Sequence, residues 1–372
     1  QNRAWDPSSS PPPSSPQPTT LANRRWCRLN VGCSMLLPWF PSQSPPLQVA
    51  PNTLVSPLGF GTWSWGNTLL WGYDKEQDES LRAAVAEVQR RGGAQNFFYD
   101  TGDSYGTGAL EGRAETLLGT FRRESRSPKR VVVGTKLAVY PTRLTGRSFE
   151  DACRASLKRM ELEQIDLVQA HWSAANLQPW QEPALWDGLA RCYEQGLARA
   201  VGTSNFGPKQ LCKVNDYWCE RGVLHTTNQV QFSLLSQLPL KSGVLDVCKE
   251  RGITPIGYSP LCLGLLSGKY SENNVPKGPR GLLFRQLLPQ LRPLLGALEE
   301  IAAARGKTCS QVAINWCISK GVLVIVGIRN PQQAIDNLGC LGWRLSAAEV
   351  IELEAIAARL PVKATQNVFQ TA

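Results

Sequence analysis

Residues 97–106 read FFYDTGDSYG: an apolar run from Phe97 to Tyr99 ends in Asp100, and Tyr105 follows one short turn later. Such a run predicts a strand that is buried on both faces. A carboxylate is costly in the middle of a buried strand, but the end of a strand can direct one into a pocket. The stretch therefore predicts a buried strand with a candidate functional carboxylate at its end.

Short apolar runs alternate with longer amphipathic stretches throughout residues 53–372. Eight runs are interpreted as strands: 56–62, 96–101, 131–137, 166–172, 198–205, 226–232, 254–260 and 322–328. The stretches between them have helical spacing, with Gly92 expected to end the helix at 78–91 and Ser148 expected to be an N-cap. Eight strands, each followed by a helix, predict the α/β class and a parallel (β/α)₈ barrel. Residues 346–360 predict one additional C-terminal helix.

A doubly wound parallel sheet is the competing fold. It requires a GxGxxG fingerprint after its first strand, and LGFGTWSWG at 58–66 does not supply one. The barrel is therefore favoured.

Composition excludes several classes of function. The 372 residues carry a formal charge of +10, which suits an anionic ligand, but no basic run interleaved with aromatics indicates nucleic-acid binding. No apolar run is long enough to span a bilayer. The 11 cysteines include no CxxC pair, which is typical of free thiols in a reducing compartment, and only two histidines are available for a zinc site.

Residues 1–52 differ from the rest because they are rich in Ser and Pro, carry several Arg and contain a single acid, Asp6. They offer too little apolar surface to form a core, so disorder is expected. The same composition is typical of an organelle transit peptide. A plain disordered tail and a mistranslated upstream stretch are the alternative interpretations.

The predicted strand ends are unusually polar. In a (β/α)₈ barrel the active site lies at the C-terminal ends of the strands. Each polar residue alone has a structural explanation, such as a helix cap or a satisfied core histidine. Together they place an acid, a base, a phenol and an imidazole in one ring: Asp100, Tyr105, Lys136, His171, Ser204, Asn205, Gln229, Tyr258 and Ser259.

These groups suit reduction of a carbonyl. A cationic Lys136 is expected to lower the pKa of the Tyr105 phenol, and Asp100 to stabilise that lysine as an ion pair. His171 can donate a hydrogen bond to a carbonyl oxygen while Tyr105 supplies a proton. No metal cluster or activated nucleophile is visible in the sequence, so a hydride from a cofactor is expected.

The other polar ends predict a dinucleotide site. Asn205 and Gln229 suit a carboxamide, and Tyr258 suits stacking on a nicotinamide ring. GIRNPQQAIDN at 327–337 opens a helix whose N-terminal amides, with Arg329, suit a phosphate. The long Gly-rich and basic loop at 261–281 is expected to close over the dinucleotide.

Six ordered motifs across residues 53–362 resemble those of the aldo-keto reductase family: DTGDSYG, VGTK, LVQAHW, GTSNF, NQVQFSLL and GYSPLCLGLLSGKY. WSWGNTLLWGYDK at 63–75 and NNVPKGPRG at 273–281 look most like the plastid members from plants and algae. Gly102, Ala170 and Phe232 replace the family's usual Ala, a larger residue and Tyr, and the first two widen the expected pocket.

The resemblance implies an NADPH-dependent oxidoreductase that interconverts an aldehyde or ketone with an alcohol in the chloroplast. It implies Tyr105 as the general acid, Lys136 and Asp100 as its tuning pair and His171 as the orienting group. Arg329 implies a preference for NADPH over NADH. The implied cofactor residues are Ser204, Asn205, Gln229, Tyr258, Ser259, Leu261, Gly264, Gly327, Arg329, Gln333 and Asn337.

Two other functions stay open at this point. One is a cofactor-binding regulatory subunit with little turnover, similar to the potassium-channel β-subunits, and the other is a structural or lipid-droplet-associated plastid protein. The expected partner is a small carbonyl substrate bound by a monomer, without nucleic acid or a membrane-spanning segment. Trp63, Trp65, Trp71 and Trp172 either line an aromatic pocket or are plain packing.

Overall fold

The computed structural model describes residues 45–363 and 370–371. The predictions of disorder and of a transit peptide for residues 1–44 lie outside the described residues. Residues 47–50, which the sequence analysis also assigns to that segment, form a strand instead.

Eight parallel strands close into a barrel, which confirms the predicted fold. Each strand pairs with its neighbour in the chain, and the last strand pairs with the first to close the ring. The strands are β3 (Leu58–Gly61), β4 (Phe97–Asp100), β5 (Val131–Leu137), β6 (Leu167–Ala170), β7 (Val201–Ser204), β8 (His225–Gln231), β9 (Thr254–Tyr258) and β10 (Leu323–Gly327).

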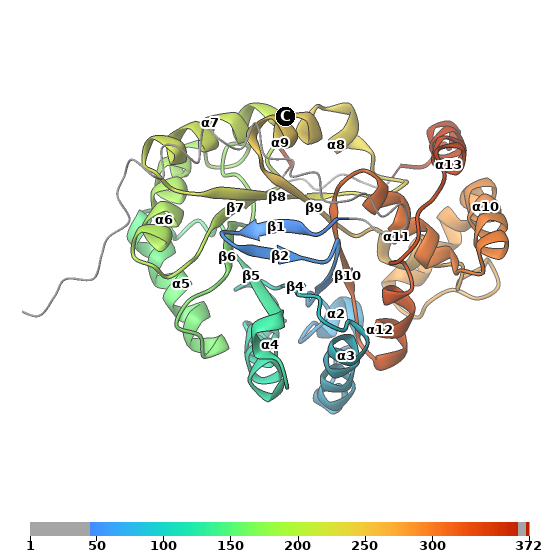
Figure 1. The fold of residues 1–372 in the computed structure, drawn as a ribbon, viewed down its shortest axis with the longest axis horizontal. Helices are drawn as coiled ribbons and strands as arrows, with labels where there is room; N and C mark the ends of the chain where they lie inside the picture. The colour runs from blue at the N-terminus through green and yellow to red at the C-terminus, as the bar shows by residue number, and fades with distance from the viewer. Residues whose placement is uncertain (1–44, 364–369, 372) are drawn as a thin grey trace, which may run out of the picture.

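Helices surround the barrel (Figure 1), and neighbouring helices pack in pairs such as α5 with α6 and α3 with α12. The long helices cover the apolar outer surface of the strands. The helices are α2 (Thr68–Trp71), α3 (Asp78–Arg91), α4 (Arg113–Glu124), α5 (Gly146–Met160), α6 (Glu182–Glu194), α7 (Pro208–Glu220), α8 (Leu238–Lys241), α9 (Val244–Arg251), α10 (Pro279–Arg305), α11 (Cys309–Ser319), α12 (Pro331–Leu338) and α13 (Ala347–Arg359).

Helix ends follow their capping residues. Helix α3 ends at Gly92 as predicted, and α13 begins at Ser346 with a capping box to Glu349. The predicted N-cap at Ser148 is wrong, because α5 begins three residues earlier. Thr145 is its N-cap, and the Thr145 and Ser148 side chains each accept a hydrogen bond from the other residue's backbone N–H.

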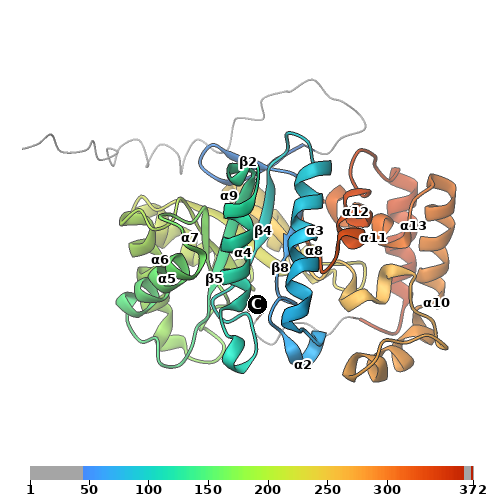
Figure 2. The same cartoon turned by 90° about the horizontal axis from the view of Figure 1, so that it is seen from below.

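A hairpin of β1 (Leu47–Ala50) and β2 (Thr53–Val55) closes one end of the barrel. Figure 2 shows this hairpin at one end of the strands and α2 at the opposite end. The Val49 carbonyl accepts a hydrogen bond of 2.7 Å from the Thr226 hydroxyl, and Val55 packs with Phe98 in the apolar core at the barrel base. The hairpin seals the N-terminal end, so the loops at the other end are free to form a site.

The stretch interpreted as one long loop at 261–281 is shorter than expected. It holds the 3₁₀ segment Cys262–Ser267, and α10 already begins at Pro279. Helix α10 packs against α11 and α13 on the outside of the barrel (Figure 1), so the predicted additional C-terminal helix lies in this outer layer.

Gly119 marks the closest approach of α4 to α5. A Cβ atom there would lie 2.3 Å from the Met160 carbonyl oxygen, whereas a Cβ at Gly296 in α10 would meet nothing within 4 Å. We expect Gly119→Ala to lower the free energy of unfolding by about 1–3 kcal/mol, because a backbone atom must move.

The matched control Gly296→Ala should raise the free energy of unfolding by about 0.5–1 kcal/mol, through helix propensity alone. Urea unfolding followed by circular dichroism measures both. Equal effects of the two substitutions would contradict the close approach of α4 to α5.

Candidate active site

The polar residues predicted at the strand ends gather at the end of the barrel opposite the hairpin. They come from six consecutive strands and the turns that follow them, so sequence positions more than 150 residues apart meet in one place. The structure places them as follows: Asp100 ends β4, Lys136 lies on β5, His171 follows β6, Ser204 ends β7, Gln229 lies on β8 and Tyr258 ends β9.

Lys136 lies at the centre of this group, with a side chain that is only 1% exposed. Its ammonium donates to both carboxylate oxygens of Asp100 at 2.6 and 2.7 Å and to the Thr101 carbonyl at 2.6 Å. An ammonium has three N–H donors, so all three are satisfied inside the protein. Burial lowers the pKa of Lys136, and the facing carboxylate of Asp100 opposes that change.

The Gln229 side chain also contacts the Lys136–Asp100 pair, a contact that the sequence analysis missed. Its side-chain amide donates to the Asp100 Oδ1 atom at 2.7 Å. The Gln229 side-chain N–H group is therefore engaged by the Asp100 carboxylate at the end of β4. Sequence reasoning had no signal for this contact, because the two residues are 129 positions apart.

The Tyr105 ring lies over Lys136, with the ammonium 4.8 Å from the ring centroid. The prediction that Lys136 lowers the pKa of Tyr105 is wrong. Burial raises the pKa of this phenol well above 10, and the negative charge of Asp100 adds to the effect. The physical reason is that Asp100 neutralises Lys136, so burial is not offset by a net positive charge.

His171 contacts Tyr105 edge to face, with ring centroids 5.7 Å apart, and packs on Trp172 at 4.9 Å. Burial, and then the cations of Lys136 and Arg143, hold the pKa of His171 well below 6.5. The imidazole is therefore neutral at pH 7, with one N–H available to donate.

A second ion pair, Asp103 with Arg143, lies beside Tyr105. The Arg143 guanidinium donates to Asp103 at 2.6 Å, and the Asp103 carboxylate also accepts from the Ala138 N–H at 3.0 Å. Asp103 is 3% exposed. The pair joins the turn that carries Tyr105 to the end of β5. DTGDSYG contains this acid, but its partner lies 40 positions away.

The Asn205 side chain is hydrogen-bonded within the protein. Its amide donates to the His171 carbonyl at 3.1 Å and to the Ser204 hydroxyl at 3.2 Å, and its Oδ1 atom accepts from the Tyr258 hydroxyl at 2.9 Å. Asn205 thus links the ends of β6 and β9. The Tyr258 ring is thereby held through its hydroxyl, beside the segment that carries His171.

Two arginine side chains, Arg280 and Arg329, lie over the same indole ring, that of Trp71, on the α12 side of the site. The Arg280 guanidinium lies 4.6 Å and that of Arg329 5.5 Å from the Trp71 ring. Burial, and then the charge of Arg280, lower the pKa of Arg329. Within residues 45–363 both guanidinium groups donate to backbone carbonyls, and neither forms an ion pair with a carboxylate. The pair therefore suits an anion.

The remaining predicted cofactor residues flank this arginine pair. Gln333 accepts the Arg329 N–H at 2.8 Å, and Asn337 donates to the Gly327 carbonyl at 3.4 Å. On the other side, the turn after β9 has positive φ at Ser259 (55°), Cys262 (47°), Leu263 (58°) and Gly264 (104°), on either side of Leu261. The two groups of residues come from the loops after β9 and β10, which are adjacent strands.

The sequence left two interpretations for four tryptophans, an aromatic pocket lining or plain packing, and the four differ in this respect. Trp65 is fully buried, packs on Phe121 and donates to the Ile328 carbonyl at 2.9 Å, so it is plain packing. Trp63 is 41% exposed and meets Trp71 edge to face. Trp63 and Trp172 lie in loops and Trp71 ends α2, all at the site end of the barrel.

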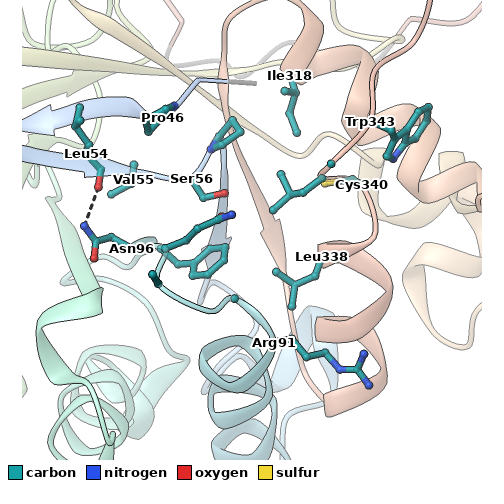
Figure 3. Close-up of a pocket in the computed structure, with 17 residues that line it drawn as sticks. Pro46, Leu54, Val55, Ser56, Arg91, Asn96, Ile318, Leu338, Cys340 and Trp343 are labelled. Carbon is teal, nitrogen blue, oxygen red and sulfur yellow. Dashed lines mark hydrogen bonds between the residues drawn. The ribbon is translucent and has the colours of Figure 1, made fainter. Parts of the chain in front are cut away.

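A hollow of about 540 Å³ lies at the opposite end of the barrel, beside the hairpin (Figure 3). Its lining includes Leu54, Phe97 and Trp343 and none of the residues that surround Lys136. Arg91 at its edge is paired with Glu87, and burial raises the pKa of Cys340. This hollow therefore lacks the acid and base groups that chemistry needs.

Among residues 45–363 and 370–371, no three His, Cys, Asp or Glu side chains come together as a metal site would require. None of the helices in this part of the chain combines the length and the apolar character needed to cross a membrane.

Residues 57–358 match the model of the aldo/keto reductase family. The chain belongs to the aldo/keto reductase family. It is accordingly an oxidoreductase of a family that uses nicotinamide cofactors.

Curated aldo/keto reductases cover most of the chain. It is 52% identical over 338 residues to a protein of Arabidopsis thaliana named "Pyridoxal reductase, chloroplastic", covering 90% of each chain. It is 28% identical over 357 residues to "Aldo-keto reductase yakc [NADP(+)]" of Schizosaccharomyces pombe, covering 88% of this chain and 97% of that one.

Solved aldo/keto reductases share the fold. A thermostable member crystallised with the inhibitor epalrestat has a TM-score of 0.65 at 23% identity, covering 83% of this chain and 98% of that one. A Klebsiella pneumoniae member in complex with NADPH has a TM-score of 0.64 at 21% identity, with 87% and 99% covered.

The direction of the Tyr105 pKa shift can be tested by titration. We expect the phenol to stay protonated up to at least pH 10, because burial raises its pKa. The alkaline rise in absorbance near 295 nm should therefore be the same for the parent and for Tyr105→Phe below that pH. A phenol that ionises below pH 9 and is lost in Tyr105→Phe would show that Lys136 dominates after all.

Proposed function

We propose that this chain is an NADPH-dependent reductase that converts an aldehyde or ketone to an alcohol. The observation that supports it most is the buried Lys136–Asp100 pair beneath a protonated phenol and a neutral imidazole. That arrangement offers two neutral donors to one carbonyl oxygen and no nucleophile to its carbon.

In this proposal Tyr105 is the general acid. Its raised pKa keeps the proton on the phenol at neutral pH, and the proton passes to the carbonyl oxygen as negative charge develops there. The phenolate that remains lies beside the Lys136 ammonium, which limits the cost of that charge. Asp100 and Gln229 hold the ammonium in place, and a proton from solvent restores the phenol.

His171 orients the carbonyl. A neutral imidazole donates one N–H to the oxygen without adding a positive charge beside Lys136. Its backbone carbonyl is held by Asn205, so the ring position depends on the β7 end as well as on β6. The imidazole thereby fixes which face of the carbonyl is presented.

The residues present fit a dinucleotide phosphate. Arg280 and Arg329 repel one another across Trp71, and an anion between them would relieve that repulsion. Ser259, Leu261 and Gly264 would hold the dinucleotide from one side, and Gly327, Gln333 and Asn337 from the other. Ser204, Tyr258, Asn205 and Gln229 would receive the nicotinamide, the last two through their side-chain oxygens, since each side-chain NH₂ group already donates within the protein. When bound there, NADPH supplies a hydride to the carbonyl carbon.

An aromatic aldehyde is the substrate class that the site suits best. Trp172 packs on the His171 imidazole, and Trp63 stands 41% exposed at the same end of the barrel, so both offer flat apolar surface at the site end. The relative at 52% identity is named a pyridoxal reductase, and pyridoxal is such an aldehyde. That relative is also named chloroplastic, which supports a plastid location for this chain.

The role of Tyr105 can be tested with a matched pair of tyrosines. We expect Tyr105→Phe to lower kcat for NADPH-dependent reduction of pyridoxal at least about 100-fold, since a general acid contributes about 10²–10⁴. The control is Tyr99→Phe. Tyr99 is buried in β4, and its hydroxyl has no hydrogen-bond partner within the described residues. Oxidation of NADPH followed at 340 nm measures both.

Equal activity of the parent and Tyr105→Phe would contradict the proposed role. Tight NADPH binding by the parent without turnover on any carbonyl would instead favour a cofactor-binding regulatory protein.

The arginine pair predicts the cofactor preference. Replacing Arg329 by Leu should raise the Kd for NADPH about tenfold or more and leave the Kd for NADH nearly unchanged, because charge-assisted hydrogen bonds to the extra phosphate are lost. The exposed Arg285 of α10 provides the control, and Arg285→Leu should change neither Kd. Isothermal titration measures both cofactors. An equal loss of affinity for NADH and NADPH would mean that Arg329 does not recognise the extra phosphate of NADPH.

A further inference from the structure

Two residues near the end of the chain, Gln370 and Thr371, lie against the loops that follow β6 and β7. We call them the C-terminal pair. The Thr371 N–H donates to the Asn205 carbonyl at 3.1 Å, and its Oγ1 atom accepts the Gly207 N–H at 2.8 Å. The Gln370 carbonyl accepts from the Asn176 side chain at 3.1 Å. Thr371 is only 7% exposed.

The C-terminal pair therefore borders a turn in a left-handed conformation. Asn205 has a φ of 63°, in the left-handed region that residues other than glycine adopt uncommonly, asparagine more readily than most. Thr371 binds the backbone on the C-terminal side of this residue, at the Asn205 carbonyl and at the Gly207 N–H, while the Asn205 N–H donates to the Gln229 carbonyl at 2.8 Å. No other described side chain is bonded to these two backbone atoms.

The turn in question reaches the candidate catalytic groups. In that conformation the Asn205 side chain donates to the His171 carbonyl and accepts from the Tyr258 hydroxyl. A change in the Asn205 backbone would move the amide that joins these two residues. The chain of contacts runs from Thr371 through Asn205 to the imidazole.

We propose that Thr371 is a positioning residue: it fixes the left-handed turn at Asn205 and thereby sets the positions of His171 and Tyr258. Gln370 contributes through its backbone carbonyl, which joins the C-terminal pair to the loop that follows His171. The effect on cofactor binding and turnover rests on the proposed function, whereas the effect on the imidazole does not.

The first readout is the NMR signal of the imidazole, which needs no cofactor. The chain has only two histidines, so selective ¹³C labelling of histidine gives one signal for His171 and one for His225. His225 is bonded to Asn215 and Thr227, away from the C-terminal pair, and is an internal control. His171→Asn assigns the two signals.

Thr371→Val keeps the shape and the backbone N–H but removes the acceptor for the buried Gly207 N–H. We expect it to shift or broaden the His171 signal and to leave the His225 signal unchanged. Thr371→Ser retains the hydroxyl and should restore the parent spectrum. Asn176→Ala, which frees the Gln370 carbonyl, should produce a smaller shift of His171.

The second readout is NADPH binding and turnover. Thr371→Val should raise the Kd for NADPH about threefold to tenfold, in line with the loss of one hydrogen bond, and should lower kcat as well as raise KM. Its melting temperature should fall by no more than several degrees, because one buried N–H loses its acceptor. Thr371→Ser should bind NADPH as the parent does.

The outcomes separate the two claims. An unchanged His171 signal in Thr371→Val, or equal shifts of His171 and His225 together with lost stability, would overturn the positioning role. A shifted His171 signal in a protein whose parent does not bind NADPH would support the positioning role and overturn the proposed function instead.

Discussion

The ammonium of Lys136, buried between two carboxylate oxygens and a backbone carbonyl, is the interaction on which the rest of the site depends. An isolated charge in the interior is strongly unfavourable, so the lysine is tolerated there only while Asp100 faces it. Asp100 in turn needs the end of β4, where a buried strand can present a carboxylate to the middle of the barrel. The Gln229 amide, arriving from the far side of the ring, fixes which way that carboxylate turns. The polar centre is therefore built from three strands, β4, β5 and β8. The apolar sheet around it lowers the local dielectric, which strengthens the electrostatic interactions and holds the charged groups in place.

A paired lysine acts differently from a lone one. Its charge is balanced by Asp100, so the phenol above it experiences burial more than attraction, and the pKa of Tyr105 rises. The cations of Lys136 and Arg143 together with burial keep His171 neutral. The result is two proton-bearing groups without net charge at one opening of the barrel. The Lys136 ammonium lies beside the phenolate that forms once Tyr105 gives up its proton, which is the moment at which a reductase of this kind would require a nearby positive charge.

The sequence predicts the parts of this structure that local pattern determines. Eight apolar runs, each followed by an amphipathic stretch, require little more than strand and helix periodicity, and polar residues at the strand ends of such a barrel must converge. The contacts among those residues are another matter. Gln229 reaches Asp100 across 129 positions, and Thr371 reaches Gly207 across 164, and no local pattern records either distance. The predicted direction of the Tyr105 pKa shift was wrong, because that direction depends on how completely the Asp100 charge cancels the Lys136 charge. The β1–β2 hairpin was missed because the four residues LQVA, of which three are apolar, give too short a signal for a strand beside a Pro-rich stretch.

The central claim is that this end of the barrel delivers a hydride and a proton to opposite ends of one carbonyl bond. NADPH carrying deuterium at the transferable position of C4 tests it directly, with pyridoxal as substrate and mass spectrometry and NMR of the product as the measurement. The account predicts one deuterium, bound to the carbon of the new alcohol, and a hydroxyl hydrogen that comes from solvent. Product without deuterium at that carbon, or with the label lost to water, would contradict it.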